Sequence, residues 1–131
     1  MENTGKTILV VDDDPYIVDL VSRQLKAKGF AVLQTTDPET AYSMAEEKKP
    51  DLIISDVAMP ALDGFTFFKG LKNNKITCQI PLVLLTGSDR VSDVEEGFVS
   101  GAQAYLLKPF DWDTAWPKLA PLLGMECPKQ S

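Results

Sequence analysis

Polar side chains that could handle a phosphoryl group stand at the ends of four short hydrophobic segments of this 131-residue chain. The acidic residues Asp12 and Asp13 follow TILVV, and Asp56 follows DLIIS. Thr86 ends PLVLLT, and Lys108 follows AYLL. If these segments are parallel strands of one sheet, the polar groups meet at its carboxyl edge, where such folds bind ligands. This set of groups predicts a site for a divalent cation and a phosphoryl group.

The predicted carboxylate cluster needs a compensating positive charge. Two carboxylates about 5 Å apart repel by roughly 3 kcal/mol at an effective dielectric constant near 20. A cluster of three therefore takes up a proton or binds a cation. Mg²⁺ suits an all-oxygen site that leaves it several water ligands. We expect Asp12 and Asp13 to hold the metal ion and Lys108 to add a positive charge opposite the acids.

Asp56 is the best candidate for a nucleophile, because it ends the segment expected to form the middle strand. An aspartate so placed can attack phosphorus and form an acyl phosphate. In-line phosphoryl transfer requires mainly positioning and charge neutralisation from the protein. The metal ion, Lys108 and the Thr86 hydroxyl can together contact the three equatorial oxygens. Gly87 leaves space and a free backbone N–H beside them.

The order of the hydrophobic segments predicts the fold. They are apolar on both faces, as central parallel strands are, and cover residues 7–11, 31–35, 51–55, 81–86 and 104–107. Helical patterns separate them, and right-handed crossovers favour the order 2-1-3-4-5. We predict an α/β fold with a doubly wound five-stranded parallel sheet, the flavodoxin-like (βα)5 type. We expect one domain over 1–131, with a core at about 6–123 and flexible polar ends.

Aspartates mark the starts of the predicted helices. Asp14 and Asp37 each precede a proline, which is typical of an N-cap followed by the first helical residue. Asp63 can cap a third helix. A fourth helix ends at Gly101 and presents an apolar stripe of Val91, Val94 and Phe98.

The last helix contains two prolines, Pro117 and Pro121. A proline inside a helix removes a hydrogen bond and costs about 3 kcal/mol or more. We therefore predict a kinked or late-starting helix over residues 112–123. A straight, uninterrupted helix there would contradict this prediction.

Composition excludes several classes of function. The net charge of −6 argues against direct nucleic-acid binding, which needs a basic surface. The chain has no histidine, so it holds no Ser-His-Asp triad, no histidine metal site and no phosphohistidine of its own. No apolar run approaches the roughly 20 residues that span a membrane, and the polar start is unlike a signal peptide. We expect a cytoplasmic protein without a membrane span.

Taken in order, four motifs closely resemble the receiver domain of two-component response regulators, in particular single-domain receivers of the chemotaxis type. The motifs are ILVVDDD, DLIISDVAMPALDGF, PLVLLTG and GAQAYLLKPF. The resemblance implies that a histidine kinase or phosphotransfer protein donates a phosphoryl group to Asp56. It also implies Mg²⁺ bound by Asp13, by Asp56 and by the backbone carbonyl of Ala58, with Asp12 contributing through water.

The resemblance also implies the parts of a switch. Thr86 and Lys108 would hold the phosphoryl oxygens, and the Lys108–Pro109 bond would be cis. On phosphorylation Thr86 would move toward the phosphoryl group and Tyr105 would rotate into the vacated space. The surface would then change for an output protein that the sequence does not identify.

Two other classes of protein could use the same topology. A metal-dependent aspartyl phosphatase or phosphotransferase commonly has a second aspartate two residues after the nucleophile, where this chain has Ala58. A flavodoxin-like cofactor-binding protein would need a glycine-rich phosphate loop after the first strand, which is absent. We therefore expect no enzyme with an external substrate, but a domain that catalyses its own phosphorylation and dephosphorylation. The small side chains of Ala58 and Ser88 would flank its pocket and influence the access of water.

Overall fold

The predicted parallel sheet is present in the computed structural model, which describes residues 4–56, 64–87 and 101–125. The sheet order is β2-β1-β3-β4-β5, and every pair of neighbouring strands is parallel, so the predicted fold class is confirmed. The described elements are β1 (Thr7–Val11), α1 (Pro15–Ala27), β2 (Ala31–Thr35), α2 (Pro38–Lys48), β3 (Leu52–Ser55), α3 (Gly64–Lys72), β4 (Leu82–Thr86), β5 (Ala102–Leu107) and α5 (Trp112–Leu122).

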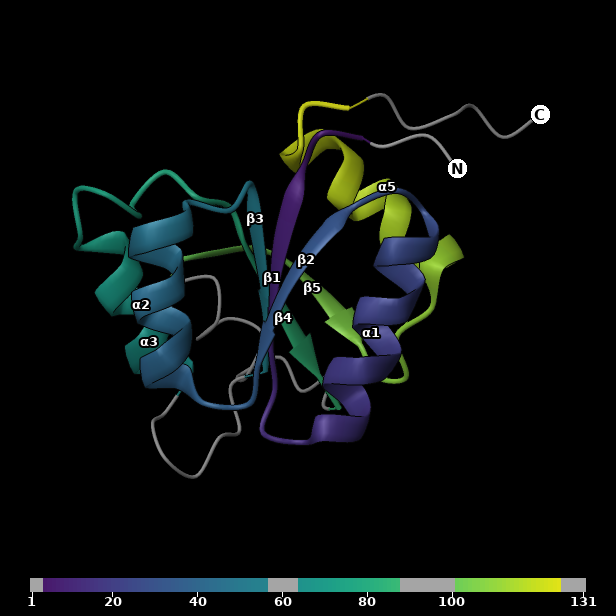
Figure 1. The fold of residues 1–131 in the computed structure, drawn as a ribbon, viewed down its shortest axis with the longest axis horizontal. Coiled ribbons are helices and arrows are strands. Elements are labelled where there is room, and N and C mark those ends of the chain that lie inside the picture. Colours follow the sequence, from purple (N-terminus) through teal and green to yellow (C-terminus); the bar gives the residue numbers. More distant parts are fainter. Residues whose placement is uncertain (1–3, 57–63, 88–100, 126–131) are drawn as a thin grey trace.

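The described helices cover both faces of the sheet (Figure 1). Helices α1 and α5 lie on one face, and α2 and α3 lie on the other. Side chains of β1 alternate between the two cores: Ile8 and Val10 pack on the α1–α5 side, and Leu9 and Val11 pack with α2 and α3. All four are fully buried. Because burying such a side chain contributes about 1.5–3 kcal/mol, β1 is a major source of stability.

Three described helices begin at an aspartate that follows the carboxyl edge of the sheet. The side chain of Asp14 accepts a hydrogen bond from the N–H of Tyr16 at 2.9 Å, and that of Asp37 accepts from the N–H of Thr40 at 3.0 Å. Asp111 caps α5 in the same way. These caps satisfy N–H groups that have no partner inside the helix. The starts predicted for α1 and α2 are therefore confirmed.

Of the two alternatives predicted for the last helix, the late start is wrong, and the kink stays a prediction. Helix α5 begins at Trp112 and continues to Leu122 without interruption, through Pro117 and Pro121. Each proline removes the hydrogen bond to the carbonyl four residues earlier. Both prolines are exposed, so water can reach that side of the helix. The buried side instead carries Leu119, which anchors the helix to the sheet.

Some predictions lie outside the described residues. These are the helix cap at Asp63 and the helix with Val91, Val94 and Phe98. Within the described ranges, no helix has the length and apolar character that crossing a membrane would require.

Ser22, on α1, carries a buried hydroxyl with no hydrogen-bond partner among the described residues. A buried polar group without a partner costs about 1–3 kcal/mol, and alanine favours helices more than serine does. We expect Ser22→Ala to raise the free energy of unfolding by about 1 kcal/mol, measured by urea denaturation.

Thr77 offers a matched control, because its buried hydroxyl donates a hydrogen bond to the carbonyl of Leu71 at 2.6 Å. Thr77→Val keeps the side-chain shape but leaves that carbonyl without this donor. Its free energy of unfolding should fall by about 1 kcal/mol or more. A loss of stability in both variants would contradict our interpretation of Ser22.

Candidate functional site

The strands that carry the predicted site residues end side by side, because β1, β3, β4 and β5 are successive neighbours in the sheet. Strand pairing continues into the loops at this edge. The N–H of Asp56 donates to the carbonyl of Val11 at 3.0 Å, and the N–H of Lys108 donates to the carbonyl of Thr86 at 2.8 Å. The backbone therefore holds Asp56 and Lys108 in fixed register beside the ends of their neighbouring strands.

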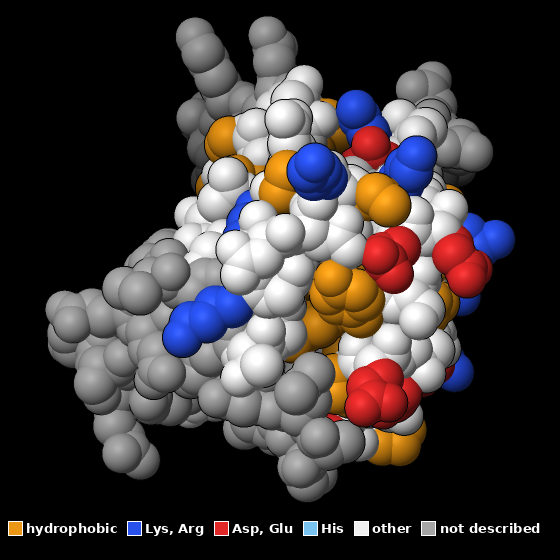
Figure 2. Space-filling model, turned by 90° about the vertical axis from the view of Figure 1, so that its left-hand side faces the viewer, with side chains coloured by type: hydrophobic (Ala, Val, Ile, Leu, Met, Phe, Trp, Pro, Cys, Tyr) orange, Lys and Arg blue, Asp and Glu red, His pale blue; other side chains and the backbone are white. Residues whose placement is uncertain are grey.

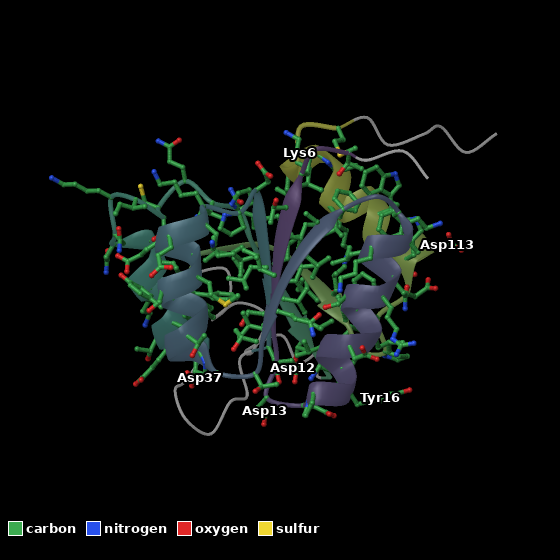
Figure 3. The ribbon with its side chains drawn as sticks, in the orientation of Figure 1. Lys6, Asp12, Asp13, Tyr16, Asp37 and Asp113 are labelled. Carbon is green, nitrogen blue, oxygen red and sulfur yellow. The ribbon has the colours of Figure 1, made fainter. Side chains whose placement is uncertain are left out.

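Lys108 joins the acidic residues of this edge. Its Nζ lies 2.9 Å from Oδ2 of Asp12 and 3.2 Å from Oδ2 of Asp56. Oxygen atoms of Asp12, Asp13 and Asp56 lie within 4.8 Å of one another. Asp12 and Asp13 are labelled in Figure 3, where both lie at the same end of the sheet, next to the start of α1. Four of the predicted site residues thus form one cluster.

The cluster combines buried and exposed charge. Asp12 is fully buried and Asp56 is 4% exposed, whereas Asp13 is exposed. Burial raises the pKa of Asp12 above its ordinary value of 3.8, although the contact with Lys108 and the N–H of Asp14 act in the opposite direction. Burial alone would lower the pKa of Lys108, but the carboxylates of Asp12 and Asp56 outweigh it and raise the pKa.

Asp14 has a role that the sequence interpretation missed. Besides capping α1, it donates its backbone N–H to Oδ1 of Asp12 at 3.0 Å. This bond fixes the orientation of the Asp12 carboxylate. The signal was available, because an aspartate commonly accepts a bond from the backbone N–H two residues later.

The donor set fits a divalent cation. Oδ2 of Asp12 is buried and receives no hydrogen bond from the described residues, since the nearby Nζ of Lys108 forms an ion pair without hydrogen-bond geometry. Three carboxylates face one lysine, so the cluster has an excess of negative charge. Oxygen ligands from Asp12, Asp13 and Asp56 are those that hard cations such as Mg²⁺ prefer.

The other predicted site residues are placed as follows. Thr86 is buried at the end of β4, beside β3, and Gly87 next to it has open space where a side chain would lie. Tyr105 lies on β5 and packs against the α2–α3 core. The Lys108–Pro109 bond is cis, as predicted. Ala58 and Ser88 lie outside the described residues.

The raised pKa of Asp12 gives a prediction for the metal-free protein. The folded state binds a proton at Asp12 more tightly than the unfolded state does, so the free energy of unfolding should fall as pH rises above 3.8, through the folded pKa. A cation that binds only the folded state adds about 2.7 kcal/mol at 100 times its dissociation constant. Thermal unfolding should therefore show stabilisation by Mg²⁺ at pH 7 and little at pH 4.

Asp12→Asn serves as the control for this pH dependence. It should lose both the fall in stability above pH 3.8 and most of the stabilisation by Mg²⁺. If Mg²⁺ stabilises this variant as much as the original protein, the cation binds elsewhere.

The sheet, the three carboxylates and the adjoining lysine define a phospho-accepting signalling module rather than a classical enzyme. Residues 8–117 match the family model of the response regulator receiver domain. The chain belongs to that family. Family membership decides against both alternatives considered for this topology, the aspartyl phosphatase and the flavodoxin-like cofactor-binding protein.

Curated relatives include regulators of transcription. The chain is 40% identical over 116 residues to the DNA-binding dual master transcriptional regulator RpaA of Synechocystis, an alignment covering 88% of this chain and 48% of RpaA. It is 42% identical over 106 residues to the alkaline phosphatase synthesis transcriptional regulatory protein PhoP of Bacillus subtilis, covering 81% of this chain and 43% of PhoP. The chain thus spans about half the length, or less, of these relatives.

Solved structures of similar proteins match along nearly their whole length. Chemotaxis response regulator CheY4 of Vibrio cholerae has a TM-score of 0.84 and 33% identity, and the match covers 91% of this chain and 99% of CheY4. The receiver domain of sensor histidine kinase PA1611 of Pseudomonas aeruginosa has a TM-score of 0.84 and 27% identity, covering 92% of this chain and 99% of that domain. That structure contains a magnesium ion coordinated in the active-site cleft.

Proposed function

We propose that this chain is a phosphorylation-controlled switch in which Asp56 accepts a phosphoryl group from a histidine kinase or a phosphotransfer protein. One observation carries the proposal: Nζ of Lys108 lies within 3.2 Å of the buried carboxylates of both Asp12 and Asp56. A buried carboxylate beside a cation can act as a nucleophile toward phosphorus once the charge of the incoming group is neutralised.

The transfer follows from the positions of these side chains. A carboxylate oxygen of Asp56 forms the new O–P bond while the P–N bond of a phosphohistidine breaks, and the leaving nitrogen takes up a proton. Lys108 exchanges its contact with Asp56 for a phosphoryl oxygen. The hydroxyl of Thr86 binds a second oxygen, and the N–H of Gly87 is available beside it. The donor histidine comes from a partner, because this chain has none.

The cation in this proposal is Mg²⁺. Asp13 and Asp56 would bind it directly, together with the backbone carbonyl of Ala58, and Asp12 would bind it through water. Mg²⁺ neutralises the carboxylates and the phosphoryl oxygens without contributing a nucleophile of its own. The excess of negative charge in the described cluster supports this assignment, and so does the magnesium ion in the similar PA1611 receiver domain.

The readout of the switch would involve Thr86 and Tyr105. In this proposal Thr86 moves toward the new phosphoryl group and Tyr105 occupies the space that it leaves. Phosphorylation then shifts a two-state equilibrium, because the phosphoryl oxygens contact Thr86 in one state only. Tyr105 lies on β5 next to the strand that ends in Thr86, which supports a direct coupling.

The setting of the domain is also a proposal. Residues 1–131 would form a single receiver domain with a core at about 6–123, acting in the cytoplasm, where histidine kinases use ATP. Output would pass through contact with another protein of unknown identity. The net charge of −6 favours a protein partner over direct contact with nucleic acid.

Incubation with phosphoramidate and Mg²⁺ tests the proposed function, with intact-mass measurement as the readout. We expect the mass of one phosphoryl group to be added and hydroxylamine to remove it, because hydroxylamine cleaves acyl phosphates. Chelation of Mg²⁺ should prevent the addition. Equal labelling with and without Mg²⁺, or a product stable to hydroxylamine, would contradict an aspartyl phosphate formed with the help of a cation.

A further inference from the structure

Lys118 reaches across the edge of the sheet to Tyr105. Its Nζ donates a hydrogen bond to the backbone carbonyl of Tyr105 at 2.8 Å and lies 4.3 Å from the centre of the Tyr105 ring. Lys118 belongs to α5, which covers the same face of the sheet as α1, whereas the ring packs against the α2–α3 core. β5 is the last strand in the sheet order, so the lysine side chain can pass around it.

The two contacts act on one residue. The ammonium is fixed to the backbone of Tyr105, so its position does not follow the ring when the side chain turns. A turn about the Cα–Cβ bond would therefore separate the ring from the ammonium. Only the present orientation of the ring retains the cation–π contact. An exposed contact of this kind shifts the equilibrium between two ring orientations by about two- to five-fold, and a desolvated one shifts it more.

We propose that Lys118 is a positioning residue, which holds the Tyr105 ring in its packed orientation and thereby sets the resting equilibrium of the switch. The functional consequence rests on the proposed function, in which phosphorylation places the Tyr105 ring in the space left by Thr86. Lys118 stabilises the packed ring before any phosphoryl group is added. Because the ring must leave this orientation to enter the space vacated by Thr86, Lys118 raises the cost of reaching the phosphorylated conformation.

The competing explanation is that Lys118 only satisfies the backbone. An edge strand presents carbonyl groups that no other strand pairs, and a lysine commonly protects such an edge. In that case loss of Lys118 would affect stability alone. The orientation of the Tyr105 ring and the binding of a phosphoryl mimic would not change.

Lys118→Met removes the ammonium and keeps much of the side-chain stem. The experiment uses the full chain with ¹³C-labelled tyrosine rings, and the three resonances are assigned with Tyr16→Phe and Tyr42→Phe. A soluble paramagnetic agent reports how far each ring is exposed to solvent. We expect greater relaxation of the Tyr105 ring in Lys118→Met and no change in Lys118→Arg, which retains a cation. Equal relaxation in all three proteins would overturn the proposal.

A second measurement uses beryllofluoride with Mg²⁺ as a phosphoryl mimic. We expect Lys118→Met to strengthen its apparent affinity by about two- to five-fold. Tyr105→Leu keeps the backbone carbonyl but removes the ring, so Lys118→Met should have no further effect in that background. An effect of the same size there would show that the charge of Lys118 matters rather than the ring, and would overturn the proposal.

Lys28→Met controls for the loss of one positive charge. Lys28 directly follows α1, and its Nζ lies 5.4 Å from the centre of the Trp112 ring. This substitution therefore also removes a cation–π contact, but one that does not involve Tyr105. We expect unchanged affinity for beryllofluoride, and a gain equal to that of Lys118→Met would overturn the proposal. If the original protein binds no beryllofluoride, the proposed function fails, while the relaxation experiment still decides whether Lys118 holds the ring.

Discussion

Asp56→Asn is expected to abolish phosphorylation by phosphoramidate and Mg²⁺ completely. An asparagine has no carboxylate oxygen that can form an acyl phosphate, and no rearrangement of the side chain restores one. The fold should persist, because the N–H of Asp56 bonds to Val11 through the backbone and is unaffected. Intact-mass measurement before and after incubation gives the result, and circular dichroism confirms that the variant is folded.

Asp37→Asn is the matched control for this variant. Asp37 also follows a strand at the carboxyl edge, but it is only partly buried and caps α2. Asparagine caps a helix as well as aspartate does, so phosphorylation should be unchanged. Labelling of Asp56→Asn at the same level as this control would show that another residue accepts the phosphoryl group.

Lys108→Met is expected to produce the largest loss of stability. It leaves the buried carboxylates of Asp12 and Asp56 without their cation. Removing one partner of a buried ion pair costs about 3–5 kcal/mol. Urea denaturation at pH 7 without Mg²⁺ should show a loss near the lower figure, because Lys108 remains partly exposed. Phosphorylation should fall as well, because one phosphoryl oxygen loses its cation.

The stability lost in Lys108→Met should depend on pH through the ionisation of Lys108 and Asp12. The pKa of Lys108 is raised in the folded state, so its contribution is fully present below 10.5 and is lost as pH rises through the folded pKa. At acid pH the carboxylate of Asp12, whose pKa is raised by burial, takes up a proton and no longer needs a cation. The difference between Lys108→Met and the original protein should therefore be greatest near neutral pH and small below pH 3.8.

A double variant distinguishes this mechanism from a packing defect. Asp56→Asn in the Lys108→Met background removes one of the two buried carboxylates that Lys108 contacts, so part of the lost stability should return. Mg²⁺ should also restore stability to Lys108→Met by replacing the missing positive charge. Additive destabilisation by the two substitutions would contradict the electrostatic explanation.

The fold was predictable because each strand carries a local signal. The segments 7–11 and 31–35 coincide with β1 and β2. The start of β5 was less visible: the strand begins at Ala102 rather than 104, and its pairing with β4 shifts register between Leu82 and Val83. Such an irregularity depends on the partner strand and leaves no mark in the periodicity of β5 itself.

Helix α5 shows why a local rule failed. A proline inside a helix has a cost in free energy, and the packing of the rest of the helix can outweigh that cost. Ala115, Leu119 and Leu123 recur at helical spacing and are buried against the α1–α5 core. Pro117 falls on the exposed side between them. The spacing of the buried residues was a better guide than the presence of proline.

The residues of the acidic site could be predicted from the sequence, but their burial could not. Parallel strands bring the residues after them to one edge, so Asp12, Asp56 and Lys108 had to lie close together. The sequence could not show that Asp12 is fully buried while Asp13 is exposed. The sequence also did not point to the contact between Lys118 and Tyr105. No motif or spacing distinguishes a lysine that passes around an edge strand from an ordinary surface lysine.

The buried strands also determine how the molecule opens. The side chains of β3 and β4 are buried along their whole length, whereas β2, at the edge, is partly exposed. Figure 2 shows the outer surface on the side of the sheet that α2 and α3 cover. Backbone amides in the central strands should therefore exchange hydrogen with solvent only during global unfolding, while those of β2 exchange through local openings. Because Asp56 directly follows β3, its attachment to the sheet should survive the small fluctuations that expose the edge.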